Sequence, residues 1–80
     1  MPTVLRKDGF RVMIYPHDHE PAHVHVWHGD AQVIVTLGQH GDGPRIRTYR
    51  DASRKMRADV WRLIAEHNDF LLTEWERRHG

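Results

Sequence analysis

The chain has 80 residues, a length that accommodates one hydrophobic core rather than two. Apolar residues make up 39% of it, so a homo-oligomer, a partner or a metal would add stability to so small a core. The net charge of +1 argues against a dedicated DNA-wrapping protein, and the absence of cysteine excludes disulfides and thiolate zinc sites.

The first predicted elements, within residues 3–15, form a β-hairpin. Asp8-Gly9 is favoured in tight hairpin turns because glycine tolerates a positive φ. After this turn, residues 10–15 alternate between apolar and polar side chains, which is typical of a strand with one buried face. Pro16 ends that strand because proline has no backbone N–H to donate.

A second pair of strands is predicted at residues 23–27 and 31–37. Apolar and polar side chains alternate in both segments, and a Gly-Asp turn lies between them. In the first of these strands the two valines face the core. The opposite face then receives His23, His25 and Trp27.

Residues 38–50 interrupt the strand pattern. Residues 38–44 contain three glycines and a proline, a composition that predicts a flexible loop. Residues 45–49 are extended in character. They form either a fifth strand at the edge of the sheet or the entry into a helix.

Residues 51–80 change to the helical period, because apolar side chains recur at three- and four-residue spacing. Asp51 or Ser53 is available as an N-cap. Asn68-Asp69 is typical of a helix that stops and restarts. We therefore expect two short helices, with one continuous helix over residues 53–78 as the alternative.

These elements predict a single α+β domain over residues 1–80. Its strand-rich part (1–37) precedes the flexible loop and candidate edge strand (38–50) and the helical part (51–80). The expected fold is a small antiparallel sheet of four to five strands, followed by two C-terminal helices packed on one face.

A cytoplasmic location is expected from two observations. No apolar run approaches the roughly 20 residues that a membrane-spanning helix needs. Residues 1–10 lack the long apolar stretch of a secretory signal.

Histidine is the compositional outlier, with eight in the chain and five within residues 17–28. The strand repeat places His23 and His25 on one face, with side chains about 7 Å apart. His17 and His19 have the same spacing in the preceding loop. The segment is therefore the first candidate for a functional surface.

A metal site is one interpretation of these histidines. Neutral imidazole suits zinc, nickel, copper and iron, and Asp18 and Glu20 supply carboxylates nearby. The spacing H-x-H-x3-H-x-H matches no standard zinc module. The candidate ligands of a divalent transition metal such as zinc or nickel are His17, His19, His23 and His25.

Acid–base chemistry without a metal is a second interpretation. Imidazole titrates near neutral pH, so His23 and His25 can serve as general base and general acid in RNA cleavage, with His17 and His19 as further candidates. Trp27 or Tyr15 would stack on bases. The cations available for the phosphate are Arg6, Lys7, Arg11, Arg45, Arg47 and Arg50.

Two further interpretations stay open. The strand histidines can simply be polar residues on a solvated face, or they can form a non-enzymatic protein interface together with Trp27. The basic residues Arg45, Arg47 and Arg50 are candidates for phosphate or partner contact, and they equally suit a solvated face at the start of a helix.

The chain opens with Pro2-Thr3-Val4-Leu5-Arg6 and Asp8-Gly9-Phe10-Arg11, and continues with Glu20-Pro21-Ala22-His23-Val24-His25-Val26. These segments resemble the opening and the H-V-H-V signature of a small bacterial family called domain of unknown function 4160. Leu71-Leu72, Trp75 and His79-Gly80 are similar to its C-terminal helix. The chain departs from the family pattern at Ala22, where a second proline is common, and in its Gly-rich loop.

The resemblance implies a function by association. Members of the family are often encoded beside a second small domain, of unknown function 2442, and the pair is classed as a toxin–antitoxin module in which the present type is toxin-like. We therefore expect a small partner encoded by an adjacent gene, and a toxin-like component that acts on RNA through its histidine-rich face. A non-enzymatic protein-interaction module and a His-based metal-binding protein are the alternatives.

Overall fold

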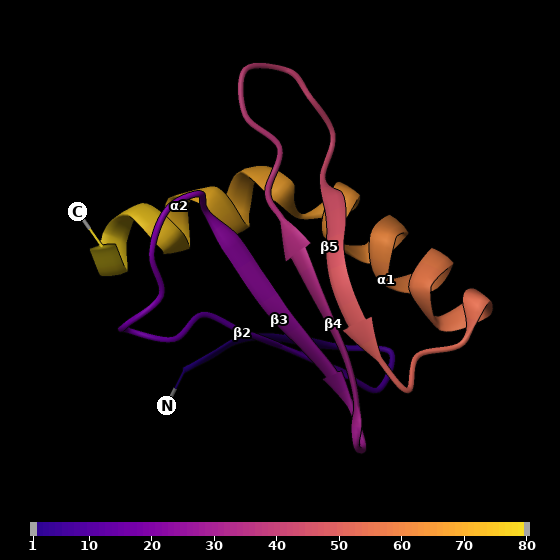
Figure 1. The fold of residues 1–80 in the computed structure, drawn as a ribbon. Coiled ribbons are helices and arrows are strands. Elements are labelled where there is room, and N and C mark those ends of the chain that lie inside the picture. Colours follow the sequence, from indigo (N-terminus) through magenta and orange to yellow (C-terminus); the bar gives the residue numbers. More distant parts are fainter. Residues whose placement is uncertain (1, 80) are drawn as a thin grey trace.

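The computed structural model describes residues 2–79 as a five-stranded antiparallel sheet with two helices behind it (Figure 1). The α+β fold expected from the sequence is confirmed. Each strand pairs with the next one in the chain, so the order across the sheet is β1-β2-β3-β4-β5. The strands are β1 (Thr3–Lys7), β2 (Phe10–Met13), β3 (His23–His28), β4 (Ala31–Thr36) and β5 (Arg45–Arg50), and the helices are α1 (Arg54–Glu66) and α2 (Asn68–His79).

The core lies between the helices and one face of the sheet. Val12, Val26 and Val33 are neighbours across the three central strands, and all three are fully buried. Val60 and Ile64 of α1 belong to the same buried cluster. The valine alternation of the sequence therefore selects the face that the helices cover. On the opposite face Trp75 of α2 reaches His23, and we call this side of the sheet the open face because, within residues 2–79, the strands there are otherwise not covered by a helix.

The two helices are separate, as the sequence predicts. Helix α1 begins after Ser53, whose hydroxyl accepts a hydrogen bond from the backbone N–H of Met56 (3.1 Å). It ends at His67, whose ring Nδ1–H donates to the carbonyl of Leu63 (2.9 Å). Within residues 2–79, neither helix is both long and apolar enough to cross a membrane.

The loop at residues 38–44 is tied to both helices. The side chain of Asn68 accepts a hydrogen bond from the backbone N–H of Gly38 (2.9 Å) and donates one to its carbonyl (2.7 Å). The indole N–H of Trp61 donates to the carbonyl of Pro44 (2.7 Å). A side chain at position 38 would collide with the backbone of Asp42, so glycine is required there. The candidate edge strand after this loop is present as β5.

Candidate functional site

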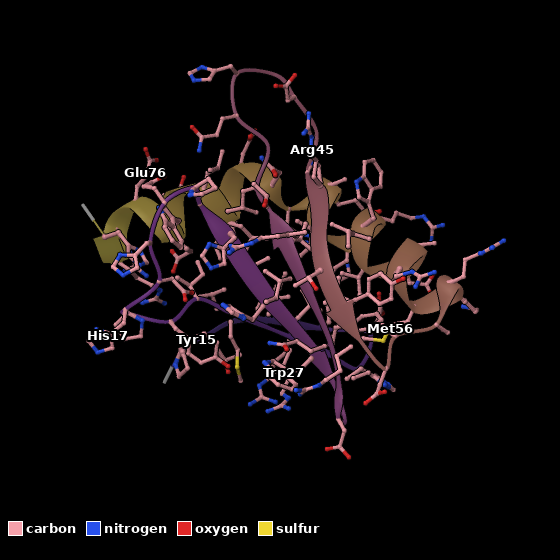
Figure 2. All side chains as sticks on the ribbon, in the orientation of Figure 1. Tyr15, His17, Trp27, Arg45, Met56 and Glu76 are labelled. Carbon is pink, nitrogen blue, oxygen red and sulfur yellow. The ribbon has the colours of Figure 1, made fainter. Side chains whose placement is uncertain are left out.

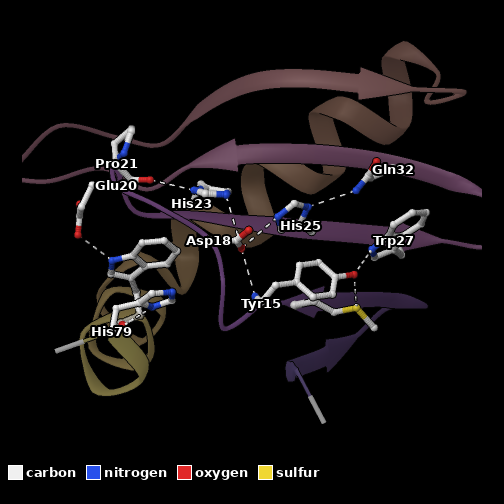
Figure 3. Close-up of polar contacts among 11 residues, drawn as sticks. Tyr15, Asp18, Glu20, Pro21, His23, His25, Trp27, Gln32 and His79 are labelled. Atoms are coloured by element: carbon white, nitrogen blue, oxygen red, sulfur yellow. Dashed lines mark hydrogen bonds and ion pairs between the residues drawn. The ribbon is translucent and has the colours of Figure 1, made fainter.

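Three polar side chains meet at the start of β3, and we call them the Asp-His cluster: Asp18, His23 and His25 (Figure 3). Oδ2 of Asp18 lies 3.2 Å from Nε2 of His25 and 3.5 Å from Nε2 of His23. The exposed fractions of the side chains are 16% for Asp18, 6% for His23 and 14% for His25. The cluster is therefore largely shielded from solvent.

A tight turn after β2 brings Asp18 to the cluster. The backbone N–H of Asp18 donates to the carbonyl of Tyr15 (3.1 Å), and the backbone N–H of Tyr15 donates to Oδ2 of Asp18 (3.1 Å). Pro16 occupies the second position of this turn, where its fixed φ is favoured. The turn holds the carboxylate in place over the sheet.

His23 is oriented by the backbone and covered by the C-terminal helix. Its Nδ1–H donates to the carbonyl of Pro21 (2.9 Å), so in the neutral ring Nε2 carries a lone pair. The indole ring of Trp75, from α2, lies 5.3 Å from the imidazole between centroids. The indole N–H of Trp75 in turn donates to the carboxylate of Glu20 (3.0 Å). The ring of His79 stacks on the indole, with 3.8 Å between the ring centroids.

His25 is fixed by contacts on both of its ring nitrogens. Nε2 faces Asp18, and Nδ1 lies 3.2 Å from the side-chain nitrogen of Gln32 on β4. The ring of Tyr15 packs edge-on against the imidazole, with 4.7 Å between the ring centroids. Burial lowers the pKa of His25, and the neighbouring Asp18 carboxylate offsets part of this effect.

The four histidines singled out in the sequence separate into two groups. His23 and His25 meet in the cluster together with Asp18. In the sequence, Asp18 lies between the other two histidines, His17 and His19. His17 and His19 are exposed on the loop, and Figure 2 shows His17 at the outer edge of the molecule. The structure thus brings together two of the four histidines and one of the two nearby carboxylates.

A second feature of the open face is a row of residues that crosses all five strands. Arg6 pairs with Arg11, Arg11 with Trp27, Trp27 with Gln32, and Gln32 with Arg50. Directly paired residues of antiparallel strands project from the same face. We call this set the arginine row.

Two aromatic residues of the open face, Trp27 of the arginine row and Tyr15, connect the row to the Asp-His cluster. The indole N–H of Trp27 donates to the hydroxyl of Tyr15 (3.2 Å), and the guanidinium of Arg50 lies 5.8 Å from the centre of the Trp27 ring. Arg47, on β5, is close enough to His25 to contribute to the lowering of its pKa. The two features are therefore parts of one surface.

A family model described as "Domain of unknown function (DUF4160)" matches residues 9–76. The chain belongs to this family. Comparison with curated proteins and with solved structures gave no match. The region shared with the DUF4160 family contains the whole Asp-His cluster and every member of the arginine row except Arg6.

Two residues that shape the cluster of this DUF4160 protein, Gln32 and Trp75, are not predicted as site residues from the sequence. Gln32 contacts His25 from the neighbouring strand, and its sequence signal is a polar side chain on the same face of a predicted hairpin. Trp75 covers His23 from the far end of the chain. Its helical spacing predicts a core position but does not predict which histidine it contacts.

The geometry limits what the cluster can do chemically. Both Nε2 atoms are directed at Asp18, so neither imidazole presents a free nitrogen to a ribose hydroxyl. This arrangement favours a small bound ion over metal-free proton transfer at the cluster itself. The arginine row, by contrast, is open and suits an anionic polymer.

Proposed function

We propose that this DUF4160 protein binds single-stranded RNA on the open face of its sheet, as the toxin-like member of a toxin–antitoxin-type pair in the bacterial cytoplasm. The observation that carries the proposal is the distribution of charge. Within residues 2–79, the strands hold none of the eleven Asp and Glu residues of the chain. They hold six of its twelve Lys and Arg residues, namely Arg6, Lys7, Arg11, Arg45, Arg47 and Arg50. Of these, Lys7 pairs with the core-packed Phe10 and therefore does not belong to the open face.

The arginine row supports an anionic ligand in particular. Arg6 and Arg11 lie directly opposite each other on β1 and β2, and like charges in this position repel. A phosphate bound between them would remove that repulsion. Arg50 extends the positive charge to the opposite edge of the sheet.

The aromatic side chains favour a single strand over a duplex. Bases that are not paired can stack on aromatic rings, and such stacking tolerates many sequences. Trp27 and Tyr15 lie on the open face and are joined by a hydrogen bond, so they form one aromatic ledge beside the arginines. Trp27 is half-buried, which fits a ring with one accessible face.

Removing charge from the row tests this proposal. We expect the double variant Arg6→Gln/Arg50→Gln to bind a labelled single-stranded RNA oligonucleotide more weakly, because two phosphate contacts are lost. The slope of log affinity against log salt concentration should fall by roughly 1.4, or about 0.7 per phosphate. Fluorescence anisotropy across a salt series, with a chelator present, measures both quantities.

The matched control is Arg54→Gln/Arg62→Gln. It removes the same charge from exposed positions on α1, on the opposite side of the sheet. This control should keep the affinity and the salt slope of the original chain. Equal weakening of RNA binding in the two double variants would show that binding follows net charge alone. If the original chain bound an acidic protein partner but no RNA, the ligand of the open face would be that protein.

A further inference from the structure

We propose that Asp18, His23 and His25 form a binding site for one divalent transition metal ion of the zinc type, with two imidazoles and one carboxylate as ligands. The proposal is independent of RNA binding. Its first support is distance. Two ligands about 2.0–2.1 Å from a tetrahedral zinc ion lie roughly 3.3 Å apart. The two Asp18–histidine separations are 3.2 and 3.5 Å.

The second support is that two hydrogen-bond acceptors, Nε2 of His23 and the carboxylate of Asp18, face each other. The Nδ1–H of His23 is committed to the carbonyl of Pro21, so in the neutral ring the lone pair of Nε2 points at the carboxylate of Asp18. Two electron-rich atoms at this separation repel unless a positive charge lies between them. His23 is only 5% exposed, so water screens this repulsion poorly. A metal ion bound by both atoms would convert the repulsion into two ligand bonds.

The third support is the set of groups around the ligands. Metal-binding histidines usually donate the second ring N–H to a carbonyl or carboxylate, which fixes the ring. His23 has this arrangement with Pro21. His25 has the side-chain amide of Gln32 at Nδ1, and a half-turn of that amide presents its oxygen to an Nδ1–H. Nε2 of His25 is then free for the metal.

The surroundings of the three ligands also suit a metal site that keeps one coordination position open. Trp75 packs against His23, and Tyr15 packs against His25, so apolar rings border the ligands. Three protein ligands leave the fourth tetrahedral position for water or for a group of a bound molecule. Mixed nitrogen and oxygen ligands favour zinc, nickel, copper or iron over magnesium or calcium.

Calorimetric titration of the tag-free, full-length chain with zinc chloride tests the site. We expect saturation at one ion per chain. Asp18→Asn and His25→Gln should each weaken binding by at least about 100-fold. Gln32→Leu, which keeps all three ligands, should weaken it by about tenfold, the usual effect of removing a supporting hydrogen bond. Magnesium chloride should give no saturable heat.

The double variant His17→Gln/His19→Gln is the matched control, because it removes two exposed histidines from the same loop. It should bind zinc within about twofold of the original chain. Loss of binding in this control with retention in Asp18→Asn would assign the ion to the loop and overturn the proposal. So would the absence of saturable binding in the original chain.

A second measurement separates a lost ligand from a lost fold. Zinc should raise the thermal midpoint of the original chain and of the loop control, because it binds only the folded state. It should leave the midpoints of Asp18→Asn and His25→Gln unchanged although both still unfold cooperatively. Because zinc is titrated without RNA and RNA binding is measured with a chelator, each proposal can fail while the other holds.

Discussion

His25 experiences opposing influences at a single imidazole ring. Burial disfavours its charged form and lowers its pKa, whereas the Asp18 carboxylate favours the charged form. Burial is the larger effect, so the folded chain takes up a proton at His25 less readily than the unfolded chain does. This difference in proton affinity makes the stability of the metal-free protein depend on pH.

We expect acidification to destabilise the metal-free protein through His25. The contribution of this residue is fully present above the unfolded-state pKa of about 6.5, and it is lost as the pH falls toward the lower folded-state pKa. Urea unfolding at pH 7.5 and pH 5.5, with a chelator, measures the loss. His25→Gln should lose less stability over this interval, and an identical loss in both proteins would contradict the assignment.

The residues of the Asp-His cluster differ in how far the sequence predicts them. His23 and His25 share a face because strand side chains alternate, so their meeting follows from spacing alone. Asp18 is recognisable in the sequence only as a nearby carboxylate, because its position depends on the turn that follows β2. The burial of His23 depends on Trp75, and no local pattern encodes a contact between residues so far apart.

The break between α1 and α2 is an example at the scale of the element. The sequence predicts it from Asn68-Asp69, and the structure places it at His67, where the backbone leaves helical geometry (φ −116°, ψ 16°). The Asn68 side chain forms two hydrogen bonds with the backbone of Gly38 instead of projecting into solvent. The sequence does not decide between a strand and a helix entry at β5, because the glycines before it indicate only a loop. The hydrogen bonds that fix this loop join residues far apart in the chain.

Asn68→Ala should destabilise the protein because it leaves two backbone groups of a buried glycine without partners. The expected decrease in the free energy of unfolding is about 1–3 kcal/mol, measured by urea denaturation. Gln39→Ala, at an exposed position in the same loop, is the control and should change this free energy by less than about 0.5 kcal/mol. If the two variants were equally stable, the hydrogen bonds between Asn68 and Gly38 would not stabilise the fold.

For the molecule as a whole, the open face and the covered face have different chemistry. The helices bury one face of the sheet, and the other face carries the arginine row, the aromatic ledge and the Asp-His cluster. A surface of this kind is expected to be occupied in the cell. In the proposed pair, RNA would occupy it and a small protein encoded by the adjacent gene would counteract the effect.

Expression of the protein alone should therefore slow bacterial growth, and co-expression of the partner from the adjacent gene should restore it. Arg6→Gln/Arg50→Gln should lose the inhibition at equal protein level, because RNA binding is weakened. Growth curves with immunoblot quantification provide the measurement. Inhibition that persists unchanged in this variant, or that the partner fails to relieve, would argue against the toxin-like role.

The neighbour-to-neighbour order of the strands has a consequence for how the chain folds. A sheet in which each strand pairs with its predecessor needs only short loops to close, and such local topologies fold quickly. Asp18, His23 and His25 lie within one such unit, formed by β2, the following loop and β3. We expect these three residues to meet early in folding, and the shielding of His23 to follow only when the last helix docks.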